Sequence, residues 1–127
     1  MTMKTMEQER AAFALAKVRP WATKSDEQQK QFRSYANSFP FMIRANGLGQ
    51  AAAFYRSKGK SDPHYDLYEI LSEWLCQSRF ALFEKQTDLL DAITENDMQV
   101  YMAAQTEALL LMSWVQRFAR AFLKSEE

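Results

Sequence analysis

The segment from Phe39 to Lys58 constrains the fold more than any other part of the chain. It reads FPFMIRANGLGQAAAFYRSK, with a proline near its start and the pair Asn46-Gly47 in its middle. Pro40 suits a first helical turn and Gly47 suits a helix C-terminus, so we expect a helical pattern that breaks at Pro40, restarts and stops at Gly47. A short, very apolar helix follows and runs into Arg56, Lys58 and Lys60. The segment predicts a tight helix–turn–helix corner with a basic exit, and nothing in it is catalytic.

Composition indicates that the rest of the chain is helical as well. Val and Ile together number only six, and no stretch alternates apolar and polar residues over the length of a strand. An apolar fraction of 47% in 127 residues is enough for one stable core. We therefore expect an all-α fold, a compact single-domain bundle of five or six helices that spans residues 1–127.

Apolar spacing and capping residues place the helices of the first half. The first is expected from Thr5 to Val18, and a capping box at Ser25 to Gln28 opens the second. The expected buried stripes of the first three helices are Ala11, Ala14, Leu15, Val18; Phe32, Tyr35, Ala36, Phe39; and Leu48, Ala51, Ala52, Tyr55.

The second half is expected to hold a long, a short and another long helix. Asp62-Pro63 predicts an N-cap and first turn, and Leu67, Ile70, Leu71, Trp74 and Leu75 form the stripe that follows. A short helix is expected at 87–93, and Thr94 to Asp97 predicts the cap of a final helix that reaches about Lys124. Its expected stripe is Met98, Tyr101, Met102, Ala108, Leu109, Met112, Val115, Ala119 and Phe122, so Met98, Met102 and Met112 are interpreted as core residues.

Charge is distributed unevenly along a chain whose net charge is zero. Residues 1–60 hold eleven Lys and Arg against four Asp and Glu, a net charge of +7, and residues 61–127 carry −7. Two explanations stay open at this point. A basic surface meets a polyanion while an acidic surface meets another partner, or the two halves fold together and their charges interleave.

Residues with catalytic potential are few. His64 is the only histidine and is interpreted as an exposed residue near a helix start, while Cys76 follows Trp74 on an apolar helix and is interpreted as a core thiol. No spacing typical of a metal site is present, and Asp88 and Asp91 are explained by their place in a first helical turn. We predict a protein that is not an enzyme and holds no metal or cofactor. No apolar run approaches the roughly 18 residues of a membrane span.

Basic residues on the last helix allow two interpretations. Arg117, Arg120 and Lys124 are spaced to form one ridge in an otherwise acidic half. The ridge compensates the dipole at the helix C-terminus, or it contacts phosphate, which the planar fork of arginine is suited to grip.

Three motifs together resemble a known family. They are E-R-A-A-x-A-x-x-x-V at 9–18, P-x-M-I-x-x-N-G-L-G-Q-A-x-A-F-x-x-x-K at 40–58, and Y-x-x-x-T-E-A-L-x-L-x-x-W-x-x-R-F-A-x-A within 101–121. The chain is similar over nearly its whole length to the small subunit of the type III-B CRISPR effector, the RAMP module or Cmr complex. The resemblance implies a non-catalytic, all-helical, cytoplasmic subunit. Its partners would be the other subunits, further copies stacked head to tail, and the target RNA/crRNA duplex in the groove beside the stack.

The resemblance also suggests which residues contact RNA. Lys58 and Arg117 occupy matched basic positions and are carried over from the family, and Lys17, Arg44 and Arg120 are added from charge and position alone. A helical adaptor or scaffold that makes only protein–protein contacts is the alternative. A hydrolase would need a nucleophile and a base that the sequence does not offer.

Overall fold

Six α-helices, a 3₁₀ turn and a π-helical turn make up the structure, a computed structural model that describes residues 3–83 and 88–126. The described part contains no strand, which confirms the all-α prediction. The elements are α1 (Met6–Val18), a 3₁₀ turn (Arg19–Thr23), α2 (Asp26–Asn46), α3 (Leu48–Ser57), α4 (Pro63–Ser72), a π-helical turn (Glu73–Gln77), α5 (Leu89–Glu95) and α6 (Met98–Phe122).

Short polar side chains begin most of these helices. Thr5 and Gln8 form a complete capping box at α1, and the side chains of Asp62 and Asp97 accept backbone N–H bonds at α4 and α6. Ser25 caps α2 as predicted, because its hydroxyl oxygen accepts from the Gln28 backbone N–H. The Gln28 side chain accepts from the Ser25 hydroxyl and not from the Ser25 backbone N–H, so the predicted capping box is incomplete. Local chemistry therefore sets four of the helix starts.

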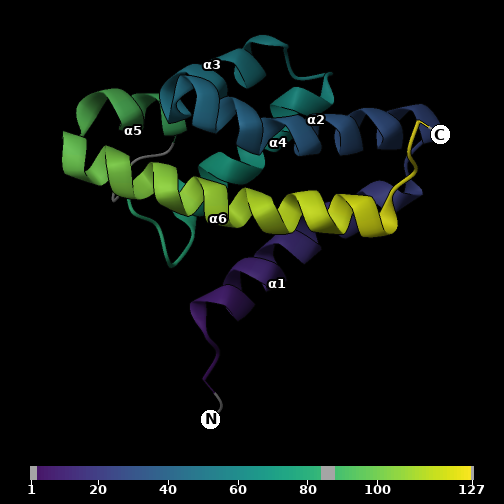
Figure 1. Cartoon of the computed structure of the whole chain (residues 1–127), viewed down its shortest axis with the longest axis horizontal. Coiled ribbons are helices and arrows are strands. Elements are labelled where there is room, and N and C mark those ends of the chain that lie inside the picture. Colours follow the sequence, from purple (N-terminus) through teal and green to yellow (C-terminus); the bar gives the residue numbers. More distant parts are fainter. Residues whose placement is uncertain (1–2, 84–87, 127) are drawn as a thin grey trace.

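The two longest helices, α2 and α6, form the frame of the molecule and lie side by side along its long axis (Figure 1). They run antiparallel, because Asn37 of α2 pairs with Gln116, and Leu48, which follows α2, pairs with Gln105. α1 crosses beneath α6 and projects from the body, while α3 and α5 lie above one end. No described helix is long and apolar enough to cross a membrane.

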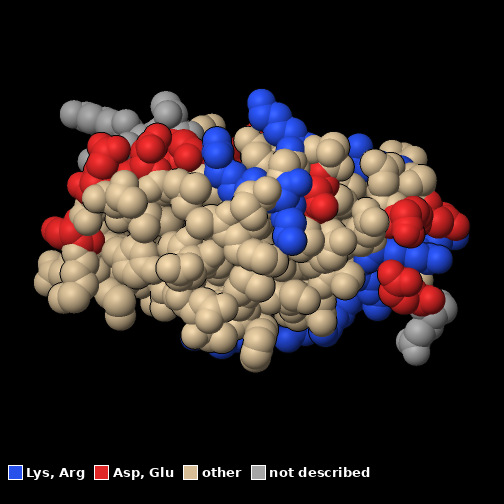
Figure 2. Space-filling view, turned by 90° about the horizontal axis from the view of Figure 1, so that it is seen from above, with Lys and Arg blue, Asp and Glu red and all other residues tan. Residues whose placement is uncertain are grey.

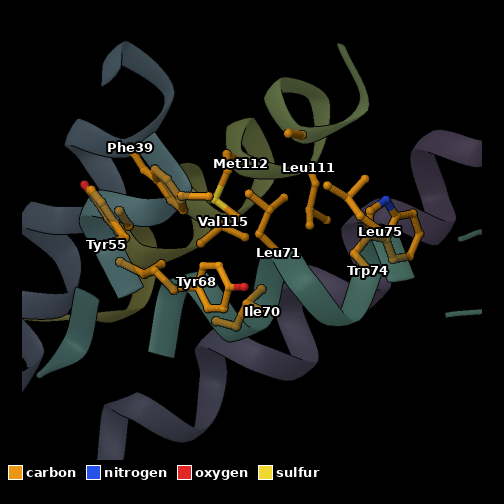
Figure 3. Close-up of a cluster of buried hydrophobic side chains, with 14 of the residues drawn as sticks. Phe39, Tyr55, Tyr68, Ile70, Leu71, Trp74, Leu75, Leu111, Met112 and Val115 are labelled. Carbon is orange, nitrogen blue, oxygen red and sulfur yellow. The ribbon is translucent and has the colours of Figure 1, made fainter. Parts of the chain in front are cut away.

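Side chains from all six helices, the 3₁₀ turn and the π-helical turn meet in one core, and Figure 3 shows a part of it. The stripe predicted for α3 is buried at all four positions, and so is the stripe predicted from Leu67 to Leu75. Tyr55 stacks on Phe39 with ring centroids 3.9 Å apart, and its hydroxyl donates to the Tyr35 carbonyl at 2.7 Å. This stack joins the corner after α2 to the middle of the bundle.

The predicted interruption at Pro40 is wrong, because α2 continues through it to Asn46. A proline at this position removes the N–H that would bond to the Ala36 carbonyl, which normally disfavours a helix interior. Here Phe39, Pro40 and Ile43 are all buried. Burial of these side chains against the rest of the bundle outweighs the lost hydrogen bond, so the corner lies at Gly47 alone.

The stripe predicted for the last helix is partly wrong. Ala108, Met112, Val115 and Ala119 are buried, but Met98 and Met102 are 75% and 55% exposed, and Phe122 is also exposed. Of the three methionines interpreted as core, only Met112 lies there. The first half of α6 carries apolar residues on both its inner and outer sides. The spacing of apolar residues alone therefore did not show which of them are buried.

Smaller differences concern helix ends. The long helix after Asp62 is α only to Ser72 and then passes into the π-helical turn, and α6 ends at Phe122. α5 spans Leu89–Glu95, and the start predicted at position 87 lies outside the described residues. In α1, Ala14 and Val18 are buried as predicted, whereas Ala11 and Leu15 are half-buried, because this helix lies at the edge of the bundle.

Candidate nucleic-acid interface

Two stretches of the chain that lack Asp and Glu, 28–61 and 108–125, supply helices that lie side by side. They contain most of α2 and the second half of α6. Gln116 Nε2 donates to Asn37 Oδ1 at 2.7 Å, and the Lys124 backbone N–H donates to Gln29 Oε1 at 3.1 Å. The surface along this contact therefore carries a cluster of basic residues, and the acidic residues Asp26 and Glu126 lie at its end, near Lys124 and Lys30. We call it the basic face and define it by Lys30, Arg33, Arg44, Arg117 and Arg120.

Three of the five predicted contact residues belong to the basic face. The Arg120 guanidinium donates to Asn37 Oδ1, which fixes it on the α2 side of α6. Arg117 is exposed one turn earlier on α6, and Arg44 is exposed two turns beyond Asn37 on the same flank of α2. The structure thus brings together residues that lie more than 70 positions apart in the chain.

The other two predicted residues lie elsewhere. Lys58 caps the C-terminus of α3, is exposed, and holds its Nζ 4.5 Å from the centre of the Phe54 ring. Lys17 lies in a separate cleft, where its Nζ is 2.7 Å from Glu73 Oε1. Because Lys17 already has an ionic partner, it is the predicted residue least available to a phosphate.

Lys30 and Arg33 are basic-face residues that the sequence reasoning did not select. Together with Arg120 they line a small polar pocket between the first half of α2 and the end of α6. A sequence signal was present, because both lie in the acid-free stretch 28–61. Their convergence with Arg120 depends on the antiparallel pairing of α2 and α6, which spacing along one helix does not reveal.

Acidic side chains gather at the end of the molecule formed by α5 and the start of α6, at the left of Figure 2. Residues 86–116 contain no Lys or Arg, and Asp88, Asp91, Glu95 and Asp97 surround α5. The ion pairs Arg10–Glu107 and Lys17–Glu73 nevertheless join the two halves of the chain. The charges of the halves therefore interleave around α1 and segregate at the α5 end.

A polar cleft of about 340 Å³ lies beside α4 and the π-helical turn, and Lys17 is one of its walls. Its acidic residues are Asp66, Glu69, Glu73 and Asp88. Burial, and then the neighbouring Glu69, raise the pKa of Asp66. Among the residues that the structure describes, no group of three or more His, Cys, Asp or Glu side chains is arranged to hold a metal ion.

His64 is not the exposed residue that the sequence suggested. Its ring stacks on Tyr35 with centroids 3.6 Å apart, and its side chain is only 12% exposed. Nδ1 lies 2.7 Å from Asp62 Oδ1. Burial disfavours the charged form of Asp62, but the bonds from the His64 backbone and ring outweigh it and hold the pKa of Asp62 below its ordinary value. His64 thus packs α4 against α2.

Cys76 lies in the core, as the sequence suggested. Burial raises the pKa of its thiol to about 11, although a hydrogen bond with Ser72 acts in the opposite direction. At neutral pH the group is a thiol and not a nucleophilic thiolate.

Comparison with known proteins gives consistent matches over nearly the whole chain. Residues 6–122 match the model of a family described as CRISPR-associated protein (Cas_Cmr5). The CRISPR system Cmr subunit Cmr5 of Thermus thermophilus is 31% identical over 122 residues, which cover 96% of this chain and 99% of that protein. The crystal structure of a CRISPR-associated Cmr5 family protein, also from Thermus thermophilus, is similar with a TM-score of 0.73 and 29% identity, and the match covers 96% of this chain and 100% of that one.

Proposed function

The chain belongs to the CRISPR-associated Cmr5 family, and from this membership we propose that it is a non-catalytic small subunit of a type III-B CRISPR effector complex that acts in antiviral defence. Its relative in Thermus thermophilus is named a subunit of the Cmr system. In the proposed role, copies stack head to tail in the cytoplasm beside the other subunits, and the basic face lines the groove that holds the target RNA. The basic face is the observation that carries this proposal.

Several properties of the basic face suit a nucleic-acid backbone. Five Lys and Arg side chains lie over α2 and α6 in stretches of sequence that contain no Asp or Glu, and Glu126 is the one carboxylate that lines the pocket among them. Three of them, Arg44, Arg117 and Arg120, are exposed. Phe41 is 72% exposed on α2, three positions before Arg44, and offers a ring on which an unpaired base can stack. Contacts of this kind hold a strand without reading its sequence.

The proposed RNA contacts are tested in the assembled complex by replacing both Lys58 and Arg117 with alanine. Affinity for single-stranded target RNA should fall, and the log–log salt slope should flatten by about 0.7 for each lost phosphate contact. The measurement is a filter-binding salt titration on complexes of verified stoichiometry. Arg79→Ala, which removes an exposed arginine that is not one of the proposed RNA contacts, is the control and should leave the slope unchanged.

Two outcomes would contradict parts of this proposal. An unchanged slope in the double variant, with assembly intact, removes these residues from the RNA path and favours the scaffold that binds only protein. Cleavage of the RNA by the purified subunit with Mg²⁺ or Mn²⁺, lost in a point variant, would contradict the non-catalytic role.

Head-to-tail stacking needs two different, complementary surfaces on each copy. The acidic end around α5 provides one of them, and exposed basic residues outside the basic face, such as Arg19 and Lys24, provide another of opposite charge. We expect self-association to weaken as salt rises, because exposed charges are screened over about 8 Å at physiological ionic strength. Sedimentation at high protein concentration, in low and high salt, measures this. Association that strengthens with salt would instead assign the contact to exposed apolar residues such as Met98 and Met102.

A further inference from the structure

The pocket between α2 and the end of α6 concentrates positive charge in a small volume. It measures about 180 Å³ and is lined by Lys30, Arg33 and Arg120 together with the polar residues Ser34 and Asn37. Ser125 and Glu126 complete the lining, so three cations face one carboxylate. The pocket is therefore suited to an anion small enough to meet all three cations at once.

Neutral oxygen atoms, and not carboxylates, hold both guanidinium groups of the pocket in place. Arg33 Nη1 donates to the Leu123 carbonyl at 3.1 Å, and Arg120 Nη2 donates to Asn37 Oδ1. Arg10 is different, because its guanidinium is neutralised by two glutamates. Each pocket arginine is thus positioned without losing its charge, and a guanidinium has five N–H donors, so others stay available to a ligand.

Asn37 organises this arrangement. Its Oδ1 accepts from Gln116 Nε2 at 2.7 Å and from Arg120, so one oxygen atom fixes two side chains of α6 against α2. Lys30 makes no hydrogen bond or ion pair that competes for its ammonium group among the described contacts, and it is partly buried at the pocket wall. The pocket combines two oriented guanidinium groups with one ammonium group, and this combination fits the tetrahedral oxygens of a phosphate group.

We propose that this pocket binds one backbone phosphate of the RNA strand, with Lys30, Arg33 and Arg120 as its contacts and Asn37 as the positioning residue for Arg120. The inference rests on the proposed function and adds a defined site to it. It predicts that the strand passes over the last turns of α6, where Arg117 and Arg120 lie, and over the first half of α2.

Two variants test the site without removing an anchor of the fold. Lys30→Ala removes one contact charge, and Asn37→Asp keeps the acceptor oxygen for Arg120 while adding a negative charge inside the pocket. Titration of the free protein with inorganic phosphate, followed by amide chemical shifts, should show saturable changes confined to 30–37 and 116–126. Lys30→Ala should weaken this binding roughly tenfold, the usual effect of losing a charged hydrogen-bond partner. Asn37→Asp should also weaken it, because the added carboxylate repels phosphate. Arg79→Ala should leave it unchanged, and thermal melts establish that all variants are folded.

The same variants in the assembled complex distinguish an RNA phosphate from a free anion. Lys30→Ala should flatten the salt slope of RNA binding by about 0.7. Phosphate binding with an unchanged RNA slope would overturn the assignment to the strand. A second result would overturn the pocket itself. In it the unsubstituted protein does not bind phosphate, and Lys30→Ala and Asn37→Asp leave the salt slope of RNA binding unchanged. If the double variant Lys58→Ala, Arg117→Ala still lowers RNA affinity, the proposed function stands without the pocket.

Discussion

Replacing Glu107 with alanine is expected to lower the free energy of unfolding by about 3 kcal/mol, because it leaves the largely buried Arg10 with only the exposed Glu7 as a partner and Trp74 Nε1 without its acceptor. Glu107 accepts from Arg10 Nε at 2.6 Å, from Arg10 Nη2 at 2.9 Å and from Trp74 Nε1 at 2.9 Å. The side chains of Arg10 and Glu107 are only 12% and 13% exposed. One carboxylate thus joins α1, the π-helical turn and α6.

Glu7 provides a matched control on the same guanidinium. It contacts Arg10 Nη1 at 2.7 Å, but its side chain is 58% exposed. Glu7→Gln should therefore change the free energy of unfolding by less than about 1 kcal/mol, as exposed ion pairs do. Urea denaturation at pH 7 measures both variants. Equal losses for Glu7→Gln and Glu107→Ala would contradict the assignment of α1 docking to the buried pair.

The Glu107 network shows why tertiary ion pairs were not predicted. Arg10 and Glu107 lie 97 positions apart, and no local pattern connects them. One signal was present in the sequence, because Glu107 is the only charged residue between Asp97 and Arg117. A lone carboxylate in such a run indicates a specific partner, although the sequence does not say which of sixteen basic residues it is.

Elements governed by local chemistry were predicted well. The caps at Ser25 and Asp62 and the end of α2 at Gly47 follow from a few neighbouring residues. The N-cap of α6 is Asp97, the last residue of the predicted cap segment Thr94 to Asp97. The continuous helix through Pro40 was not predicted, because the local preference of proline against a helix interior is overridden by burial. The exposed positions of Met98 and Met102 were missed for a related reason. Which apolar flank of a helix is covered depends on where the other helices pack.

The candidate site was predicted in the same partial way. Charge along the chain pointed to Arg44, Arg117 and Arg120, and the fold places all three on one face. The contribution of Lys30 and Arg33 required the pairing of α2 with α6. Lys17 shows the reverse case, because a sequence cannot reveal that Glu73 lies 2.7 Å from its ammonium group.

Gly47→Val is expected to lower the free energy of unfolding by at least about 2 kcal/mol, through backbone strain and crowding together. Gly47 has φ 88° and ψ 157°, a conformation that is essentially restricted to glycine. A Cβ at this position would lie 3.4 Å from Tyr101 Oη and 3.8 Å from Gln105 Oε1. These two atoms accept the N–H bonds of Gly49 and Leu48, so they cap α3 from α6. A branched side chain would therefore disturb the start of α3 as well as the turn.

The other two glycines separate strain from crowding. Gly59 has φ 92°, and a Cβ there meets no atom within 4 Å, so Gly59→Ala should show the cost of the backbone conformation alone, about 1 kcal/mol. Gly49 lies in the first turn of α3, and its Cβ would make ordinary contacts at 3.6 Å with Ile93 and Tyr101. Gly49→Ala should be neutral or stabilising by up to about 1 kcal/mol, because alanine favours the helical conformation more than glycine does.

Urea denaturation of the three variants should therefore find Gly47→Val the least stable, Gly59→Ala intermediate and Gly49→Ala the most stable. A Gly47 variant as stable as Gly49→Ala would show that the corner does not depend on the glycine conformation.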